Sequence, residues 1–330
     1  MTYNEFRLLL KASMKSEDTE EWIDVHFTRP IGLLFALLWN KLGVHPNAIT
    51  LLSIVLGAGA GWMFHYTDLG HNVAGVVLLM LANFCDSTDG QMARLTGKKT
   101  LVGRILDGFS GDVWFFCIYF ALCWRMMGQT IPGTDMRWGA IIWVLAFVAG
   151  VLCHSRQSSL ADYYRQIHLF FLKGREGSEL DSYESQRAVY ERLRVGESCS
   201  GMRLPRSQWL ARLFFYNYAN YCRSQERRTP HFQRFFREWK VENTMHDALC
   251  IMNDDVVRRE LLSGSRPLMK WTNVLTFNVR AICLYVTCLA DCPWVYFVFE
   301  IVVLTIIYIY MHRSHEHLCE RLTKKLMTER

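Results

Sequence analysis

Four aspartates stand close together in one stretch of the sequence, between two long apolar segments. Asp86 and Asp89 are three residues apart, and Asp107 and Asp112 follow. Residues three or four apart share one face of a helix, so the first two carboxylates are expected side by side. Carboxylates beside a bilayer-length helix are costly to desolvate and need a compensating partner. Clustered carboxylate oxygens favour one or two Mg²⁺ or Mn²⁺ ions, and such ions serve phosphate chemistry.

Small residues and one arginine lie between these aspartates. A short or missing side chain lets a ligand approach the helix, and an arginine can pair with a phosphate or a carboxylate. If the two flanking helices pack as antiparallel neighbours, the third aspartate faces the first two. Asn47 and Thr50, at the start of the preceding apolar segment, could lean toward a nucleotide or cap a helix. The candidates for binding a diphosphate, besides the aspartates, are Gly90, Ala93, Arg94 and Gly103.

The composition predicts an all-α, polytopic membrane protein. Hydrophobic residues make up 51% of the 330-residue chain. Six apolar segments each approach the ~20 residues that a helix needs to cross a bilayer. These segments lie at about 48–66, 72–92, 101–127, 137–160, 271–290 and 293–311.

The six segments divide the chain into five parts. Residues 1–44 are expected to form cytosolic and interfacial helices, because the apolar run IGLLFALLWNKLGV is too short to span a bilayer. Residues 45–164 hold the first four spans, and residues 165–268 form a cytosolic, mainly helical insert rich in arginine and aromatics. Residues 269–312 hold the last two spans, and residues 313–330 form a basic cytosolic tail. At the membrane face, the insert is expected to contact anionic lipid headgroups rather than nucleic acid.

The distribution of basic residues predicts the orientation. The linkers near 67–72, 128–136 and 290–293 contain no Lys or Arg, whereas the insert and the tail are rich in both. The positive-inside rule therefore places both termini, the aspartates and the insert in the cytosol. The N-terminus is charged throughout, which argues against a cleavable signal peptide.

Polar residues in the later spans are candidates for binding an acceptor or its head group. His154 and Arg156 end the fourth span, where the alternative is a solvated helix end. Asn278 and Arg280 lie inside the fifth span, a costly place for a guanidinium. Arg280 is therefore expected to meet either an anionic substrate group or a structural carboxylate. Arg104 could add a further cation near the aspartates.

The chain resembles the CDP-alcohol phosphatidyltransferase family in the pattern Asp86-x2-Asp89-Gly90-x2-Ala93-Arg94-x8-Gly103-x3-Asp107. The resemblance extends to the opening of the first span, the preceding interfacial helix and the six spans, and it leaves the insert outside. It implies transfer of a phosphate-linked group from a CDP-alcohol to an acceptor hydroxyl, with release of CMP. It also implies that the aspartates hold one or two divalent ions, that the last aspartate deprotonates the acceptor, and that the protein is a homodimer.

The resemblance breaks at one position. The family has a fourth aspartate four residues after the third, and Gly111 stands there, followed by Asp112. On an ideal helix, a shift of one residue rotates a side chain by about 100°. A π-bulge over residues 107–112 would restore the facing, so we expect Asp112 to serve as base and metal ligand through such a bulge, beside Asp107. The alternatives are a helper residue elsewhere or loss of activity.

The substrate pair stays open. Some family members use CDP-diacylglycerol with a polar acceptor such as serine, glycerol phosphate or inositol phosphate, others use CDP-choline or CDP-ethanolamine with a lipid acceptor, and some use CDP-inositol. The insert and the stretch SRQSSLADYYRQIHLFFLKGREGSELD look similar to a bacterial branch associated with the synthesis of inositol phosphoceramide, a sphingolipid. This resemblance implies that the protein lies in the bacterial inner membrane. Hypotheses from another class are a transporter that uses the acids as a cation path, or a catalytically inactive scaffold.

Overall fold

The computed structural model describes residues 3–14, 16, 18–97, 101–195, 208–245 and 251–328. Within these ranges the regular elements are helices, with one isolated β-bridge between Thr130 and Arg137. Six helical segments are long and apolar enough to cross a membrane, which confirms the expected all-α membrane fold. They are Pro46–Phe64, Leu69–Thr96, Ile105–Met126, Ile141–Lys173, Val256–Leu289 and Trp294–Thr328.

The chain folds into two compact units. The first unit combines Met1–Arg156 with Phe277–Thr305, and the second combines Gln157–Thr276 with Ile306–Arg330. The aspartate stretch belongs to the first unit. The insert belongs to the second unit, which also takes in the chain beyond Ile306.

The first unit begins with α1 (Tyr3–Ser13), a π-helical turn η1 (Asp24–Thr28) and α2 (Arg29–Lys41). A proline in its first turn helps to start α2. Helix α2 packs against α4 (Leu69–Thr96) so closely that a Cβ added to Gly32 would lie 2.7 Å from Gln91 Oε1. Exposed large apolar residues lie on α2, as expected of an interfacial helix: Leu34, Phe35 and Leu38.

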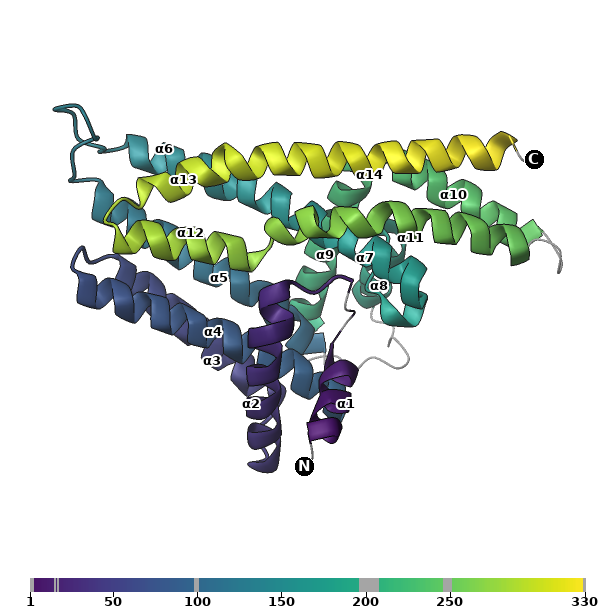
Figure 1. Ribbon diagram of the computed structural model, residues 1–330, viewed down its shortest axis with the longest axis horizontal. Coiled ribbons are helices and arrows are strands. Elements are labelled where there is room, and N and C mark those ends of the chain that lie inside the picture. The colour runs from purple at the N-terminus through teal and green to yellow at the C-terminus, as the bar shows by residue number, and fades with distance from the viewer. Residues whose placement is uncertain are drawn as a thin grey trace. The chain divides into compact units, whose positions relative to one another are not determined.

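Helices α3 (Pro46–Phe64), α4 and α5 (Leu101–Met126) form the core of the first unit, with α3 in contact with the other two (Figure 1). Close approach depends on small residues in α3. A Cβ added to Gly61 would lie 2.9 Å from a backbone carbon of Cys117 in α5. Helix α4 ends at Gly97, whose φ of 68° favours glycine.

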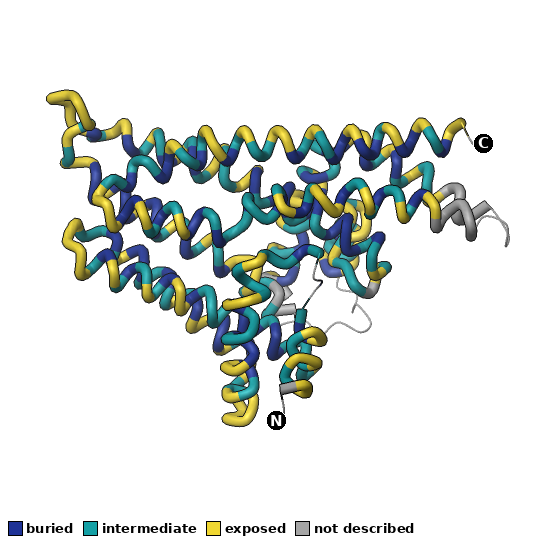
Figure 2. Tube along the Cα trace, viewed as in Figure 1, coloured by how far each residue is buried: buried dark blue, intermediate teal, exposed yellow. Residues whose placement is uncertain are grey.

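Four shorter elements complete the first unit: α6 (Ile141–Phe147), the π-helical η2 (Val148–His154), α12 (Phe277–Leu289) and α13 (Trp294–Ile301). Their buried residues join Trp114 and Ile118 of α5 in one hydrophobic cluster. Exposed residues run along the spans in Figure 2. On α3 and α4 they include large apolar side chains, which suits contact with lipid: Leu51, Val55, Trp62, Val73 and Val77.

The second unit is built around α7 (Ser155–Lys173), which is buried along much of its length. The other elements are η3 (Arg175–Gly177), α8 (Tyr183–Val195), α9 (Gln208–Arg228), α10 (Pro230–Met245), α11 (Ile251–Val274) and α14 (Val303–Thr328). Insert aromatics such as Phe232 and Phe235 are buried and pack with Phe171 and Tyr163 of α7. These rings therefore act as core, and the expected basic tail continues α14.

Candidate metal and nucleotide site

Three aspartates bring their carboxylates together at the junction of α4 and α5. Asp86, Asp89 and Asp107 each offer one oxygen, and these oxygens lie within 4.8 Å of one another. Asp89 is buried, Asp86 is half-buried and Asp107 is exposed. Because Mg²⁺ binds oxygen at 2.0–2.1 Å, ligands on opposite sides of the ion are about 4.2 Å apart, so the group fits one small cation. An all-carboxylate set suits Mg²⁺ or Mn²⁺ better than zinc.

Two hydroxyl groups orient the first two carboxylates. Thr50 Oγ1, from α3, donates a hydrogen bond to Asp89 Oδ2. Ser110 Oγ, from α5, lies 2.9 Å from Asp86 Oδ1 and 2.8 Å from the Asp107 carbonyl oxygen. Such second partners fix the direction of a ligand and strengthen metal binding. Thr50 therefore acts on a carboxylate in this structure, rather than only capping its helix.

Gly90 lies between the carboxylates and an arginine. A Cβ on Gly90 would lie 3.3 Å from Arg94 Nη1, so the guanidinium folds back over this glycine. Arg94 Nε donates to the backbone oxygen of Ser13 at 2.6 Å, whereas Nη2 is buried without a hydrogen-bond partner among the described residues. Gly90 thus lies between the carboxylates of α4 and the Arg94 guanidinium, with Arg94 Nη1 as its nearest neighbour.

The prediction of a π-bulge over residues 107–112 is wrong. Helix α5 is continuous α-helix from Leu101 to Met126, so Asp112 is not rotated onto the side of Asp107. Asp112 is exposed and lies outside the group of three carboxylates. A Cβ at Gly111 would meet no atom within 4 Å, so the position of the missing carboxylate is open space. Glycines permit a bulge, but regular hydrogen bonding prevails here.

Arg280 forms an ion pair with a structural carboxylate. It is 1% exposed and forms an ion pair with Glu300 of α13, which is fully buried. His154 Nδ1 lies 3.1 Å from Arg280 Nη1 and 3.4 Å from Glu300 Oε1. Of the two expected partners for this guanidinium, the structure contains the carboxylate. This buried cluster holds α12, α13 and η2 together.

The other residues predicted to bind the acceptor have different surroundings. Asn278 Nδ2 donates to Glu21 Oε2 at 2.8 Å and to Asp24 Oδ1 at 3.0 Å, which ties α12 to the N-terminal segment. Arg156 is exposed at the start of α7. The side chain of Arg104 lies outside the described part of the chain. Among the described contacts, Asn278 therefore binds carboxylates of the N-terminal segment rather than those of the aspartate group.

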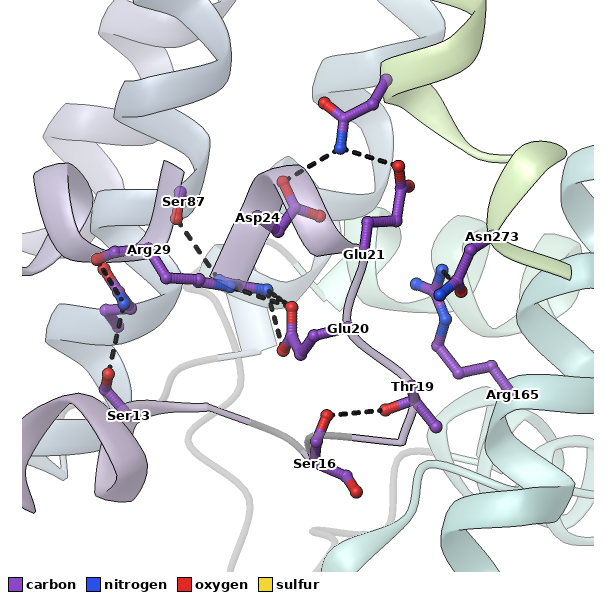
Figure 3. A network of polar contacts seen from close by, with 12 residues as sticks. Ser13, Ser16, Thr19, Glu20, Glu21, Asp24, Arg29, Ser87, Arg165 and Asn273 are labelled. Carbon is purple, nitrogen blue, oxygen red and sulfur yellow. Dashed lines mark hydrogen bonds and ion pairs between the residues drawn. The ribbon is translucent and has the colours of Figure 1, made fainter. Parts of the chain in front are cut away.

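The N-terminal segment contributes residues that sequence reasoning missed. Gln91 of α4 is fully buried, and its Nε2 donates to Ser13 Oγ at 3.2 Å and to the Arg29 carbonyl oxygen at 3.0 Å. Arg29 reaches Ser87 Oγ at 3.4 Å and forms an ion pair with Glu20 at 3.0 Å (Figure 3). A sequence offers no signal for these contacts, because Arg29 and Ser87 are 58 residues apart.

Six spans and a carboxylate group at a helix junction define a polytopic membrane protein with a candidate cation site. The family model described as CDP-alcohol phosphatidyltransferase matches residues 43–166, which include the whole aspartate stretch. Residues 43–166 are therefore similar to the CDP-alcohol phosphatidyltransferase family, and this match covers less than half of the chain.

Two curated relatives match shorter stretches. The chain is 31% identical over 67 residues to archaetidylinositol phosphate synthase from Pyrococcus horikoshii, and 38% identical over 69 residues to an uncharacterized protein from Aquifex aeolicus. The alignments cover 20% and 21% of this chain, respectively, and 34% of each relative. The chain therefore spans about a third of the length of these relatives.

Proposed function

We propose that this protein is a metal-dependent CDP-alcohol phosphotransferase of phospholipid synthesis. The observation that carries the proposal is the convergence of Asp86, Asp89 and Asp107 in the segment that the family model matches. Three carboxylates this close repel one another unless a cation offsets their charge. Their oxygens would hold one or two Mg²⁺ or Mn²⁺ ions, which would neutralise a bound diphosphate.

The chain's own residues then have distinct tasks. Gly90, Ala93 and Gly103 add little side-chain bulk where the nucleotide would approach, and Arg94 Nη1, which lies over Gly90, offers an N–H group to the diphosphate. The acceptor oxygen attacks the phosphorus that carries the alcohol, a new P–O bond forms, and the P–O bond to CMP breaks. The acceptor proton passes to a carboxylate, for which Asp107 is placed best because it is exposed beside the other two. Asp112 remains a second candidate, on sequence grounds alone.

An inositol phosphate is the favoured acceptor. The relative from Pyrococcus horikoshii bears the name of a synthase whose product contains inositol and phosphate. With that acceptor the CDP-alcohol is a lipid, such as CDP-diacylglycerol. Serine, glycerol phosphate and the inositol phosphoceramide pathway are alternatives that rest on the sequence resemblance. The cytosolic termini, the bacterial inner membrane and the homodimer likewise rest on sequence arguments.

The proposal is tested with purified protein in lipid nanodiscs, Mg²⁺ and a panel of CDP-alcohols, each offered with several acceptors. Formation of CMP that depends on both substrates supports the enzyme. A transporter or an inactive scaffold forms no CMP with any pair. Mass spectrometry of the lipid product then identifies the acceptor, with inositol 1-phosphate as the expected best substrate.

A further inference from the structure

The N-terminal segment places a second guanidinium on the motif helix. Ser87, Gln91 and Arg94 follow one another at spacings of four and three residues, so they share one face of α4. Ser13 and Arg29 cover this face through the hydrogen bonds described above. At 100° per residue, the face lies beside that of the aspartates, and Gly90 falls between the two.

The two guanidiniums on this face differ in how far their N–H groups have hydrogen-bond partners. Arg29 has a side chain 17% exposed, paired with Glu20, whose side chain is 6% exposed. Arg94 Nη2 is buried and has no hydrogen-bond partner among the described residues. Arg29 therefore has a carboxylate partner, whereas the hydrogen bond described for Arg94 goes to a backbone oxygen. A buried charged donor without an acceptor calls for an explanation, and an absent ligand is one.

We propose that Arg29 and Arg94 form an anion site for a phosphate monoester carried by the acceptor. Arg94 Nη2 donates to one phosphate oxygen, and Arg29 supplies the second positive charge. Arginine suits this task because its planar guanidinium can donate two parallel hydrogen bonds to phosphate oxygens. The inference rests on the proposed function, because it assigns the acceptor of that same reaction.

Glu20 sets the strength of this site. Its carboxylate binds Arg29 Nε at 3.1 Å and Nη2 at 3.2 Å, so it occupies the donors that a phosphate would use. The acceptor phosphate must share or displace this internal anion. Glu20 is therefore a positioning residue that weakens phosphate binding. The two guanidiniums favour a phosphorylated alcohol over a neutral one, because only the former carries negative charge.

The test compares binding of inositol 1-phosphate and glycerol 3-phosphate with that of inositol and glycerol. The full-length protein is placed in phosphatidylcholine nanodiscs, and Kd is measured calorimetrically without a CDP-alcohol. We expect the phosphorylated alcohols to bind more tightly than the neutral ones by about tenfold, as one extra charged contact gives. Addition of phosphatidic acid to the nanodiscs shows whether a lipid phosphate competes for the same site.

Three variants test the roles of Glu20 and Arg29 in phosphate binding. Glu20→Gln is expected to lower the Kd for the phosphorylated alcohols, because it removes the internal anion, and Arg29→Gln is expected to raise it. Arg194→Gln, which breaks the exposed ion pair with Glu191 in the second unit, serves as the control and should change neither. A misfolded N-terminal segment cannot tighten binding, so the Glu20→Gln result stays decisive. Equal binding of both kinds of alcohol, or unchanged or weaker phosphate binding in Glu20→Gln, overturns the inference.

The two proposals fail separately. If CMP forms with neutral alcohols alone and Glu20→Gln does not change the Kd for phosphorylated alcohols, the proposed phosphotransferase activity is supported and the anion site is refuted. If Glu20→Gln binds phosphorylated alcohols more tightly but no substrate pair yields CMP, the anion site is supported and the phosphotransferase activity is refuted.

Discussion

At the scale of single residues, the orientation of Asp89 by Thr50 has a measurable consequence. Thr50→Val keeps the shape of the side chain and removes the donor, so Asp89 loses the hydrogen bond that directs its carboxylate. Loss of such a partner reduces metal affinity or activity by about 10- to 100-fold. We expect the Mg²⁺ concentration for half-maximal CMP formation to rise. Ser53→Ala is the matched control, since Ser53 Oγ donates to the Thr50 carbonyl oxygen of its own helix.

The missing fourth carboxylate gives a second prediction. Gly111→Asp adds a carboxylate one turn after Asp107, into space where a Cβ meets no atom within 4 Å. If this helix face receives the acceptor proton, the rate of CMP formation rises by about tenfold or more, as added general-base catalysis allows.

Asp112 is the internal comparison for that variant. Because it is exposed and outside the carboxylate group, we expect Asp112→Asn to stay within about threefold of the wild-type rate, far below the 10²- to 10⁴-fold effect of a general base. A collapse of activity in Asp112→Asn, with no gain in Gly111→Asp, would restore Asp112 as the base.

At the scale of elements, the contact between α3 and α5 depends on glycine. Gly61→Ala would place its Cβ 2.9 Å from a backbone carbon of Cys117, which cannot rotate away. Overpacking of this kind costs about 1–3 kcal/mol. We expect a lower melting temperature in detergent. Gly59→Ala on the same helix meets only a leucine methyl group of Leu78 at 3.6 Å and should be neutral or slightly stabilising; equal effects of both variants would refute the close contact.

The buried ion pair that links α12 and α13 gives a further prediction. Glu300→Gln leaves Arg280 buried without its counter-charge, and loss of one partner of a buried pair costs about 3–5 kcal/mol. The double variant Arg280→Met with Glu300→Leu removes both charges and should unfold closer to the wild-type temperature. A double variant that is as unstable as the single one would show that the pair contributes in some other way.

The elements that sequence reasoning predicted well are those whose signal is local. Apolar length predicted the spans, and the spacing of Asp86 and Asp89 predicted a shared face. Asp107 joined them because consecutive helices are usually neighbours. The bulge at Asp112 failed because glycines allow an alternative backbone without requiring it. Residues distant in sequence gave no signal: Glu21 and Asn278 are 257 residues apart.

At the scale of the whole molecule, the first unit carries the carboxylate group on α4 and α5, with a hydroxyl from α3 bound to Asp89. The second unit has its own aromatic core. The aromatic residues of the insert pack in that core, and arginines of the insert bind backbone oxygens. The rings fill the interior, and Arg258, for example, donates to the backbone oxygen of Phe171 at 2.5 Å. Composition alone could not separate this packing role from a binding role, because both use the same residue types.

The central claim is that Asp86, Asp89 and Asp107 hold a divalent ion that the phosphotransfer requires. CMP formation is measured in nanodiscs before and after EDTA treatment, with Mg²⁺ or Mn²⁺ added back, for the wild type and Asp107→Asn. Asp68→Asn is the control, since this carboxylate lies at the other end of α4 and accepts from the His71 N–H. We predict CMP formation that EDTA abolishes, that either ion restores, and that falls by at least about 100-fold in Asp107→Asn alone. CMP formation that survives EDTA or the Asp107→Asn change would contradict the account.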